Sequence, residues 1–301
     1  MRIAVTGSSG LIGSALVRSL LADDHEVVRL VRRHSALGVQ PDGSIGVGWN
    51  PDRGELDLAG LAGVEAVVHL AGAGVAEHRW TDAYKERIRE SRVRGTRTLA
   101  EGLTRLDTPP SVLVSASAMG FYGQTGDRVI EESAPAGQDF LAEVCVAWEG
   151  AARPAAEAGI RVVHPRTGLV LSAAGGAGGR LFPLFRLGLG GRLGDGGQYW
   201  SFISLADELA ALRFLIDRPE LSGPVNLTAP HPVTNAELTA ALGRVLRRPT
   251  PFPVPEAVLR LVLGEMAIEV VGSHRVLPAK LLAAGFEFAH PEVEAAVRAA
   301  L

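Results

Sequence analysis

The sequence predicts an α/β protein built on a doubly wound parallel sheet, followed by a smaller C-terminal α/β lobe. Three observations support this fold class. Short β-branched runs alternate with longer helical stretches over the first two thirds of the chain, which is typical of successive βαβ units. A glycine-rich turn joins the first expected strand to the first expected helix. After residue 166 the alternation ends and a different pattern begins.

The expected elements of the first part follow one another in a regular order. Strands rich in Val, Ile and Leu are expected at 2–6, 25–31, 64–71, 112–117 and 161–166, and helices at 11–22, 81–103 and 140–157. Continuous apolar runs of this length are typical of strands buried on both faces. Helices should therefore cover both sides of the sheet.

The last part of the chain is expected to form the smaller lobe. We expect 1–228 to form the larger domain and 229–301 the lobe, with an excursion at about 172–200 contributing to the lobe. The glycine-rich residues 173–197 indicate either loops beside a ligand or a lid, or else a flexible connection without function. A strand is expected at 198–204, a helix at 205–216 and a strand at 223–229. Thr234 and Glu237 have the spacing of a capping box that opens a helix at 235–246.

Composition excludes several classes of protein. The chain has 301 residues, of which 47% are hydrophobic and 21% charged, as in ordinary globular proteins. A formal net charge of -3 argues against a nucleic-acid partner. The single cysteine, Cys145, excludes an internal disulfide framework and fits a reducing compartment. With no leader-like start and no apolar run of membrane length, a cytoplasmic protein without a membrane partner is expected.

The strongest local pattern is Gly7-Ser8-Ser9-Gly10-Leu11-Ile12-Gly13, which follows a hydrophobic strand and opens a helix. In the Rossmann fold such glycines permit a sharp turn, close approach of a pyrophosphate and tight packing of helix on strand. The N–H groups at the helix start then attract phosphate. We therefore expect dinucleotide binding by Gly7, Ser9, Gly10, Leu11, Ile12 and Gly13.

The end of the second expected strand indicates which dinucleotide is bound. NAD sites usually place an acidic residue there, to bind the ribose 2′-hydroxyl. This strand instead ends in Arg32 and Arg33. Guanidinium groups suit the additional 2′-phosphate of NADP, which they bind through forked hydrogen bonds. The sequence therefore predicts NADP(H) as the cofactor.

Further motifs resemble those of the extended and atypical short-chain dehydrogenase/reductases. His69-Leu-Ala-Gly-Ala-Gly74, Arg92-Val-Arg-Gly-Thr96, Ser115-Ala-Ser-Ala-Met-Gly-Phe-Tyr-Gly123 and Arg166-Thr-Gly-Leu-Val-Leu171 occur in the family's order. The segments GLGGRLGDGGQYWSFISLADE, VNLTAPHPVTN and KLLAAGFEF look like one subfamily, epimerase family proteins with a C-terminal domain of unknown function. The resemblance implies further cofactor contacts from Leu70, Ala71, Gly72, Gly74, Arg92, Ser115, Ala116, Arg166, Thr167 and Gly168.

The usual catalytic pair of that superfamily, Tyr-x-x-x-Lys, is missing. The residues four positions after Tyr84, Tyr122 and Tyr199 are Ile88, Gly126 and Ile203. Aligning the family's downstream Glu on Glu149 places Leu141 at the Tyr position and Cys145 at the Lys position. Arg92 similarly stands where many members have an Asn of the proton relay. The standard mechanism of alcohol oxidation therefore does not fit this chain.

Substitutes for the missing pair are Ser117, which matches the family's active-site serine, and Tyr122, which fits a proton donor or a structural residue equally well. Cys145 is better explained as a small buried hydrophobe. Asp127, Glu132 and Glu149 are better explained as surface carboxylates than as catalytic acids.

Other notable residues lie elsewhere in the chain. Gln198, Tyr199 and Trp200 are expected either to line the substrate pocket or to belong to the core. The cations of 85–97 alternate with Glu86 and Glu90, which is typical of a solvated, salt-bridged face. The scattered histidines predict no metal site.

Two functions remain compatible with the sequence. One is an NADP(H)-dependent oxidoreductase or nucleotide-sugar epimerase-like enzyme with a non-standard acid and a small-molecule substrate of unknown identity. The other is a non-catalytic dinucleotide sensor or scaffold that acts through a protein partner. A homodimer is left open.

Overall fold

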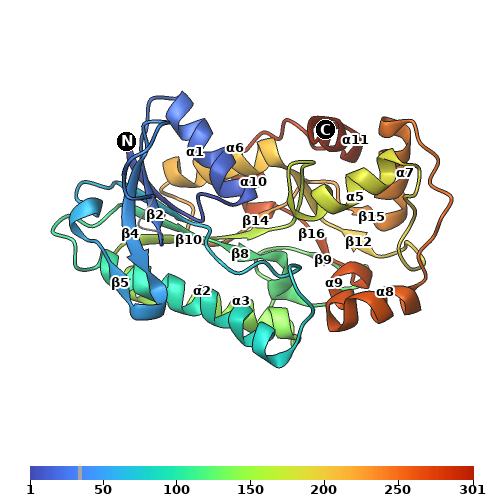
Figure 1. The fold of residues 1–301 in the computed structure, drawn as a ribbon, viewed down its shortest axis with the longest axis horizontal. Coiled ribbons are helices and arrows are strands. Elements are labelled where there is room, and N and C mark those ends of the chain that lie inside the picture. Colours follow the sequence, from blue (N-terminus) through green and yellow to red (C-terminus); the bar gives the residue numbers. More distant parts are fainter. Residues whose placement is uncertain (33–35) are drawn as a thin grey trace.

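A computed structural model of the chain describes residues 1–32 and 36–301. Arg33, one of the two arginines expected at the 2′-phosphate, lies outside the described residues. A central sheet with helices on both sides occupies one end of the molecule, and a smaller lobe occupies the other (Figure 1). The α/β fold class predicted from the sequence is confirmed.

In the described part of the chain, ten strands form the main sheet, whose path runs β14-β10-β7-β6-β1-β2-β4-β3. The strands are β1 (Arg2–Thr6), β2 (Glu26–Val31), β3 (Gly38–Val39), β4 (Ile45–Asn50), β5 (Glu55–Leu56), β6 (Ala66–His69), β7 (Val112–Ser115), β8 (Ser117–Ala118), β10 (Arg161–Thr167) and β14 (Gly223–Leu227). All pair in parallel except β3 and β5, which lie antiparallel to β4 at one edge. The chain order reverses between β1 and β6, and ligands of such sheets bind at this point, beyond the carboxyl ends of the strands.

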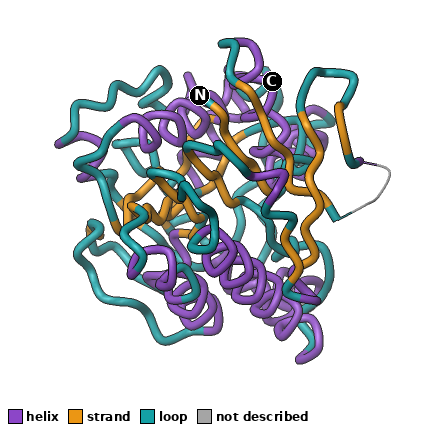
Figure 2. The backbone as a smooth tube through the Cα atoms, turned by 90° about the vertical axis from the view of Figure 1, so that its left-hand side faces the viewer, coloured by secondary structure: helices purple, strands orange, loops and turns teal. Residues whose placement is uncertain are grey.

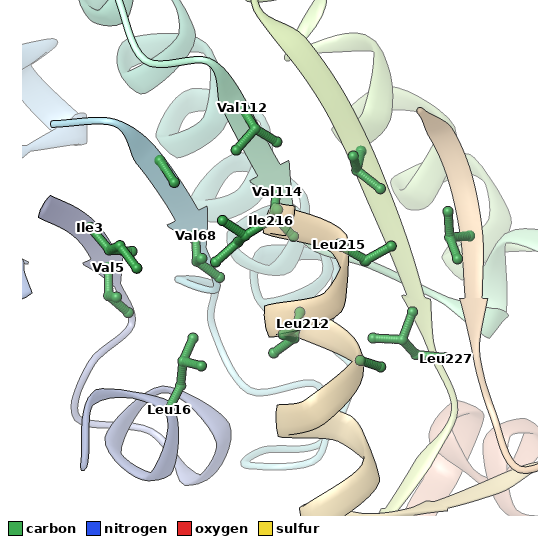
Figure 3. Packing of buried hydrophobic residues seen from close by; sticks show 14 of the residues in the cluster. Ile3, Val5, Leu16, Val68, Val112, Val114, Leu212, Leu215, Ile216 and Leu227 are labelled. Atoms are coloured by element: carbon green, nitrogen blue, oxygen red, sulfur yellow. The ribbon is translucent and has the colours of Figure 1, made fainter. Parts of the chain in front are cut away.

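Helices cover both faces of the sheet, because its strands carry apolar side chains on both sides. Helices α1 (Leu11–Ala22) and α6 (Leu205–Asp217) lie on one face, and α2 (Asp82–Leu103), α3 (Phe140–Gly150) and α4 (Arg153–Glu157) on the other. Figure 2 shows the strands as a middle layer between helices. Figure 3 shows the core of the first face, where Leu16 of α1 and Leu212 of α6 lie beside the strand side chains.

The smaller lobe has its own hydrophobic cluster. Its elements are α5 (Gly176–Arg186), α7 (Asn235–Leu246), α8 (Glu256–Leu263), α9 (Ile268–Val271), α10 (Ala279–Ala283) and α11 (Val293–Ala299), with the short strands β9 (Val129–Ile130), β11 (Leu169–Leu171), β12 (Tyr199–Trp200), β13 (Phe202–Ser204), β15 (Val233–Thr234) and β16 (Arg275–Val276). Phe182 of α5 packs there with Leu238 of α7 and Val297 of α11. Leu281 and Phe286 return to the core of the main sheet. The lobe is therefore tied to the larger domain by its own chain end.

Several expected elements differ from the observed ones. The strand expected at 112–117 is divided into β7 and β8, with Ala116 between them. The helix expected at 140–157 is two helices, α3 and α4, because Pro154 has no N–H to continue the hydrogen-bond ladder. The glycine-rich residues 173–197 include the helix α5, whose apolar side chains pack into the lobe. The strand expected at 198–204 is divided into β12 and β13, which pair with different partners, β15 and β11.

Two further details concern the ends and edges of elements. The capping box is confirmed: Thr234 accepts a hydrogen bond from the Glu237 N–H while the Glu237 carboxylate accepts one from the Thr234 N–H. Strand β4 is absent from the expected strands. Its sequence IGVGWN contains two glycines, which are uncommon in strands, and Gly46 is needed because a Cβ there would lie 1.7 Å from the carbonyl oxygen of Ala36.

Candidate functional site

The turn between β1 and α1 has the geometry expected of a phosphate-binding loop. Gly7 has a φ of +66°, and a Cβ on it would lie 2.8 Å from the carbonyl carbon of Leu70. A Cβ on Gly13 would lie 2.2 Å from the Gly7 oxygen. No side chain caps the start of α1. Its first N–H groups are thus available to an anion, in the arrangement that binds phosphate in related folds.

A buried hydrogen-bond chain holds the turn after β6 against this loop. The Thr6 hydroxyl accepts hydrogen bonds from the N–H groups of Leu70 (3.0 Å) and Ala71 (3.1 Å) and lies 2.7 Å from His69 Nδ1. Burial lowers the pKa of His69 to about 4, so the ring is neutral. Since the Thr6 oxygen already accepts two hydrogen bonds, its own proton is left for Nδ1, which places the ring proton on Nε2, 3.0 Å from the Thr96 hydroxyl. The turn 70–74 is therefore positioned from β1, β6 and α2 together.

A cavity of about 610 Å³ opens at the carboxyl ends of β1, β2 and β6. The described residues that line it are Gly7, Ser8, Ser9, Arg29, Leu30, Val31, Arg32, Ala36, Gln40, Trp49, Pro51, Asp52, Ala71, Gly72, Ala73, Gly74, Glu77, Arg87 and Ser91. Cavities of this size hold nucleotide-sized ligands. The cavity therefore lies at the edge of the sheet where the sequence predicts cofactor binding.

The residues expected to bind the cofactor divide into two groups. Gly7, Ser9, Arg32, Ala71, Gly72 and Gly74 line the cavity. Gly10, Leu11, Ile12, Gly13, Leu70, Arg92, Ser115, Ala116, Arg166, Thr167 and Gly168 are not among its lining residues. Several of the second group lie beyond the cavity, on β7 and β10 and directly after these strands, where the network around Ser117 begins. Their role at the cofactor stays a prediction.

Arg29 is a cavity residue that the sequence reasoning missed. It lies within β2, three residues before Arg32, and pairs with Asp42. Its Nε is buried and has no partner among the described residues. Hydrogen bonds from Ser44, together with Arg29, lower the pKa of Asp42. A signal was present in the sequence, since Arg29 interrupts an otherwise apolar strand, EVVRLV.

Ser117 belongs to a buried polar network next to the missing catalytic pair. Its hydroxyl donates to Glu149 Oε1 at 2.7 Å. Arg166 binds both oxygens of Glu149, through Nε at 2.8 Å and Nη2 at 2.9 Å. The Arg166 side chain is 4% exposed and the Glu149 side chain 14%, so this ion pair is largely shielded from water. Glu149 was expected to be a surface carboxylate; it is instead the acceptor of this network.

Tyr122 lies on the other side of Arg166 and is fully hydrogen-bonded. Its hydroxyl accepts a hydrogen bond from Arg166 Nη1 at 3.0 Å and donates to Asn226 Oδ1 at 2.6 Å. Burial raises the pKa of the Tyr122 phenol, against the opposing effect of Arg166. Glu132 is also buried and accepts from the Asn226 N–H at 3.0 Å, although a surface position was expected. The geometry favours a supporting role for Tyr122 over proton donation.

The two positions of the missing pair are apolar in their surroundings. Leu141 packs with Trp80, Tyr84 and Met266 in a hydrophobic cluster. Cys145 is 3% exposed, and burial raises the pKa of its thiol to about 12, so it is neither a nucleophile nor a base near neutral pH. The interpretation of Cys145 as a small buried hydrophobe fits this environment.

Arg92 does not lie on the solvated face that is expected for the cations of 85–97. Its Nη1 donates to the carbonyl oxygens of Ala73 (2.9 Å) and Ile88 (3.0 Å). Its guanidinium carbon lies 4.9 Å from the ring centre of Trp148, and the absence of a Cβ at Gly72 leaves room for it. Other cations of this helix do fit the expectation, for example Arg94, which pairs with Glu90.

The remaining candidates lie in or around the lobe. Gln198 and Trp200 are buried and donate hydrogen bonds to the Val270 carbonyl, and Tyr199 is partly buried beneath the guanidinium of Arg275. Asp127 is exposed. Within the described ranges, no three His, Cys, Asp or Glu side chains gather as metal ligands would. Likewise, none of the described helices has the length and apolar character needed to span a membrane.

Comparisons with known proteins agree with this geometry. The profile of the NAD dependent epimerase/dehydratase family matches residues 3–227, and a domain of unknown function matches residues 254–300. An epimerase family protein of Mycobacterium bovis is 50% identical over 289 residues, which cover 96% of this chain and 93% of that protein.

Two solved structures are similar over the whole of this chain. The human epimerase family protein SDR39U1, crystallised with NADPH, has a TM-score of 0.89 at 31% identity and is covered to 99%. A nucleoside-diphosphate sugar epimerase of Corynebacterium glutamicum has a TM-score of 0.81 at 36% identity, and this chain covers 58% of it. The glycine turn, the parallel sheet and these similarities lead to one conclusion: the chain belongs to the NAD dependent epimerase/dehydratase family.

Proposed function

We propose that the protein binds NADP(H) and is an oxidoreductase or nucleotide-sugar epimerase-like enzyme of the short-chain dehydrogenase/reductase type, acting on a small-molecule substrate. The observation that carries the proposal is that the glycine turn, the 70–74 turn, Arg29 and Arg32 line one cavity. When bound, the cofactor supplies or accepts a hydride. The human relative crystallised with NADPH supports the choice of cofactor.

The residues that line the cavity or shape the glycine turn fit NADP(H) in three respects. A Cβ on Gly7 or Gly13 would collide with the backbone of Leu70 or of Gly7, so these glycines permit the tight turn that directs the start of α1 toward a pyrophosphate. Arg32 lines the cavity just after β2, where the 2′-phosphate is recognised in this fold. Arg29 adds a second guanidinium, with a buried Nε that has no partner in the described part of the chain. Arg29 and Arg32 at the cavity, with no acid at the end of β2, favour NADP(H) over NAD(H).

Proton handling is assigned to Ser117 and Glu149 together: a proton from a substrate hydroxyl passes to Ser117 Oγ while the Ser117 proton passes to Glu149 Oε1. Because the Ser117 hydroxyl donates to Glu149, the lone pairs of Ser117 Oγ are available to accept a hydrogen bond from a substrate hydroxyl. Arg166 binds both oxygens of Glu149 and holds the side chain in place, so Arg166 is a positioning residue. Tyr122 takes no part as a donor in this proposal, because Asn226 already receives its proton.

The experiment combines binding and turnover. Calorimetry with NADPH and NADH tests the cofactor, and absorbance at the NADPH band follows turnover with a panel of aldehydes, ketones and nucleotide sugars, with product analysis for epimerisation. Ser117→Ala should lower kcat by about 10²-fold or more, as removal of a group in the proton path does. Ser133→Ala is the matched control, because Ser133 is exposed. No heat with NADPH would refute the proposal.

A second function is favoured by one specific observation. Leu141 and Cys145 place a hydrophobic cluster and a neutral thiol where the superfamily's catalytic pair stands. A dinucleotide sensor or scaffold that acts through a protein partner would need no such pair. Tight NADPH binding without turnover across the panel would favour this function, whereas turnover abolished by Ser117→Ala would reject it.

Location and assembly are also proposals. We infer that the protein is cytoplasmic, since its one cysteine is a buried free thiol, as suits a reducing compartment. Light scattering coupled to size-exclusion chromatography measures the molar mass in solution and so distinguishes a monomer from a homodimer. Cell fractionation with an antibody to the chain tests the location.

A further inference from the structure

Arg92 is a cation that no group of the described chain neutralises. It rises from α2, and its Nη1 donates only to the backbone oxygens of Ala73 and Ile88. No carboxylate of the described residues lies within ion-pair distance of it. The side chain is only partly exposed and rests on the Trp148 ring. A cation in such surroundings costs free energy unless it has a partner of opposite charge.

The groups around Arg92 do not supply that charge. Glu149, on the same helix as Trp148, is already bound through both oxygens by Arg166. Cys145 lies near Arg92, but burial raises the pKa of its thiol to about 12, so it carries no charge. Tyr84 donates its phenolic proton to the Gly74 carbonyl at 2.5 Å, and burial raises its pKa. Arg92 Nε and Nη2 thus keep N–H donors for which the described residues offer no acceptor.

The position of Arg92 indicates where a ligand would meet it. The 70–74 turn contacts Gly7 of the glycine loop through Leu70 and Ala71, and it contacts Arg92 through Gly72 and Ala73. Arg92 is therefore at the opposite end of this turn from the phosphate-binding loop. It faces α3 at Trp148, one turn after Cys145, whose thiol lies 3.9 Å from the carbonyl oxygen of Ala118, next to Ser117 in the chain.

We propose that Arg92 binds an anionic group of the substrate, a carboxylate or a phosphate, while Ser117 meets the reacting oxygen. The inference rests on the proposed function and deepens it, since it assigns the substrate to the acidic carbonyl or hydroxy compounds, among them phosphate-bearing sugars. The phosphates of the cofactor have other partners in the proposed binding mode, namely the start of α1 and the arginines of β2. Arg92 is therefore available to bind an anionic group of the substrate. A guanidinium binds either oxyanion through two parallel hydrogen bonds.

The test uses the whole protein saturated with NADP⁺. Sodium oxalate and inorganic pyrophosphate are titrated separately by calorimetry at low ionic strength, as probes of a carboxylate and of a phosphate. The variants are Arg92→Gln, which removes the charge, and Arg92→Lys, which keeps the charge but loses the planar fork. Arg89→Gln is the matched control, because Arg89 is an exposed arginine on the same helix.

We expect the wild type and Arg89→Gln to bind at least one probe equally well. Arg92→Gln should weaken that binding about tenfold or more, and Arg92→Lys should fall between them, as expected for loss of a charge-assisted hydrogen bond. The NADP⁺ dissociation constant should change less than threefold in every variant. If Arg92→Gln does not fold, as judged by circular dichroism, Arg92→Lys decides alone.

Three results would overturn the inference. In the first, the wild type binds neither probe. In the second, the Arg92 variants bind a probe as tightly as the wild type does. In the third, the affinity of the variants for NADP⁺ falls as much as their affinity for the probe, in which case Arg92 serves the cofactor. Failure of the wild type to bind NADP⁺ at all would instead refute the proposed function, and this inference with it. Normal NADP⁺ binding with no Arg92-dependent anion binding refutes the inference alone.

Discussion

Glu208 lies in the first turn of α6 with none of its side chain exposed. Its Oε1 accepts a hydrogen bond from the Thr167 hydroxyl at 2.9 Å, and its Oε2 has no partner among the described residues. Burial raises the pKa of this carboxyl to about 8 from 4.5, against the smaller opposing effect of Thr167. Near neutral pH the folded protein therefore holds a proton on Glu208 that the unfolded chain has lost.

The direction of the effect on stability follows from the two pKa values. Below pH 4.5 both states are protonated and Glu208 has no effect; as the pH rises to about 8, the free energy of unfolding falls, because the unfolded chain gains by ionising. Between pH 5 and pH 7.5 the loss should be about 3 kcal/mol, at about 1.4 kcal/mol for each pH unit. Replacement of Glu208 by Gln removes this dependence, since the amide is isosteric and does not titrate in this range.

Urea unfolding followed by circular dichroism at pH 5.0, 6.5 and 7.5 measures this difference. Relative to that of the wild type, the free energy of unfolding of Glu208→Gln should rise by about 3 kcal/mol between the lowest and the highest pH. The amide of Gln also leaves a buried donor without a partner, which lowers the stability of the variant by the same amount at every pH. The test is therefore the change with pH in the difference between the variant and the wild type, not the size of that difference at one pH. Glu86→Gln is the control for an exposed carboxylate. If the difference between Glu208→Gln and wild type is the same at all three pH values, the argument from burial is wrong.

Three further outcomes are expected. Arg29→Gln should raise the dissociation constant of NADPH about tenfold and that of NADH less than twofold, in calorimetry, because only NADPH carries the 2′-phosphate; equal losses would contradict the assignment. Gly13→Val should lower the thermal midpoint and abolish NADPH binding, since its Cβ would lie 2.2 Å from the Gly7 oxygen; binding with unchanged affinity would show that the turn can shift. Thr234→Ala should cost about 1 kcal/mol in urea unfolding and Thr234→Ser much less, because only the alanine loses the cap; equal stability of the two would exclude a contribution from the capping box.

The structure confirms the local features that depend on short stretches of sequence. The glycine turn, the strand before it and the helix after it are adjacent in the chain, and their backbone geometry follows from glycine's conformational freedom and from apolar patterning. The capping box at Thr234 is likewise local. The start of α3 agrees with the sequence pattern, but its end does not, because Pro154 interrupts the helix although the apolar pattern continues.

The polar network could not be predicted in the same way. Ser117, Glu149 and Arg166 lie on β8, α3 and β10, and they meet because β8 pairs with β10 in a register that places Ser117 opposite Arg166. Nothing near Glu149 in the sequence distinguishes it from a surface carboxylate. Its burial depends on which face of α3 packs on the sheet.

By itself, the sequence determined the fold class, the glycine turn between β1 and α1 and the position of Arg32 directly after β2, because these depend on neighbouring residues and on the period of the apolar pattern. Only the tertiary structure decided that Arg29 joins Arg32 at the cavity, that Glu149 is held by Arg166, and that Arg92 turns inward instead of toward solvent. The physical reason is that burial and ion pairing depend on strand order and helix packing, which bring together groups that are distant in the chain.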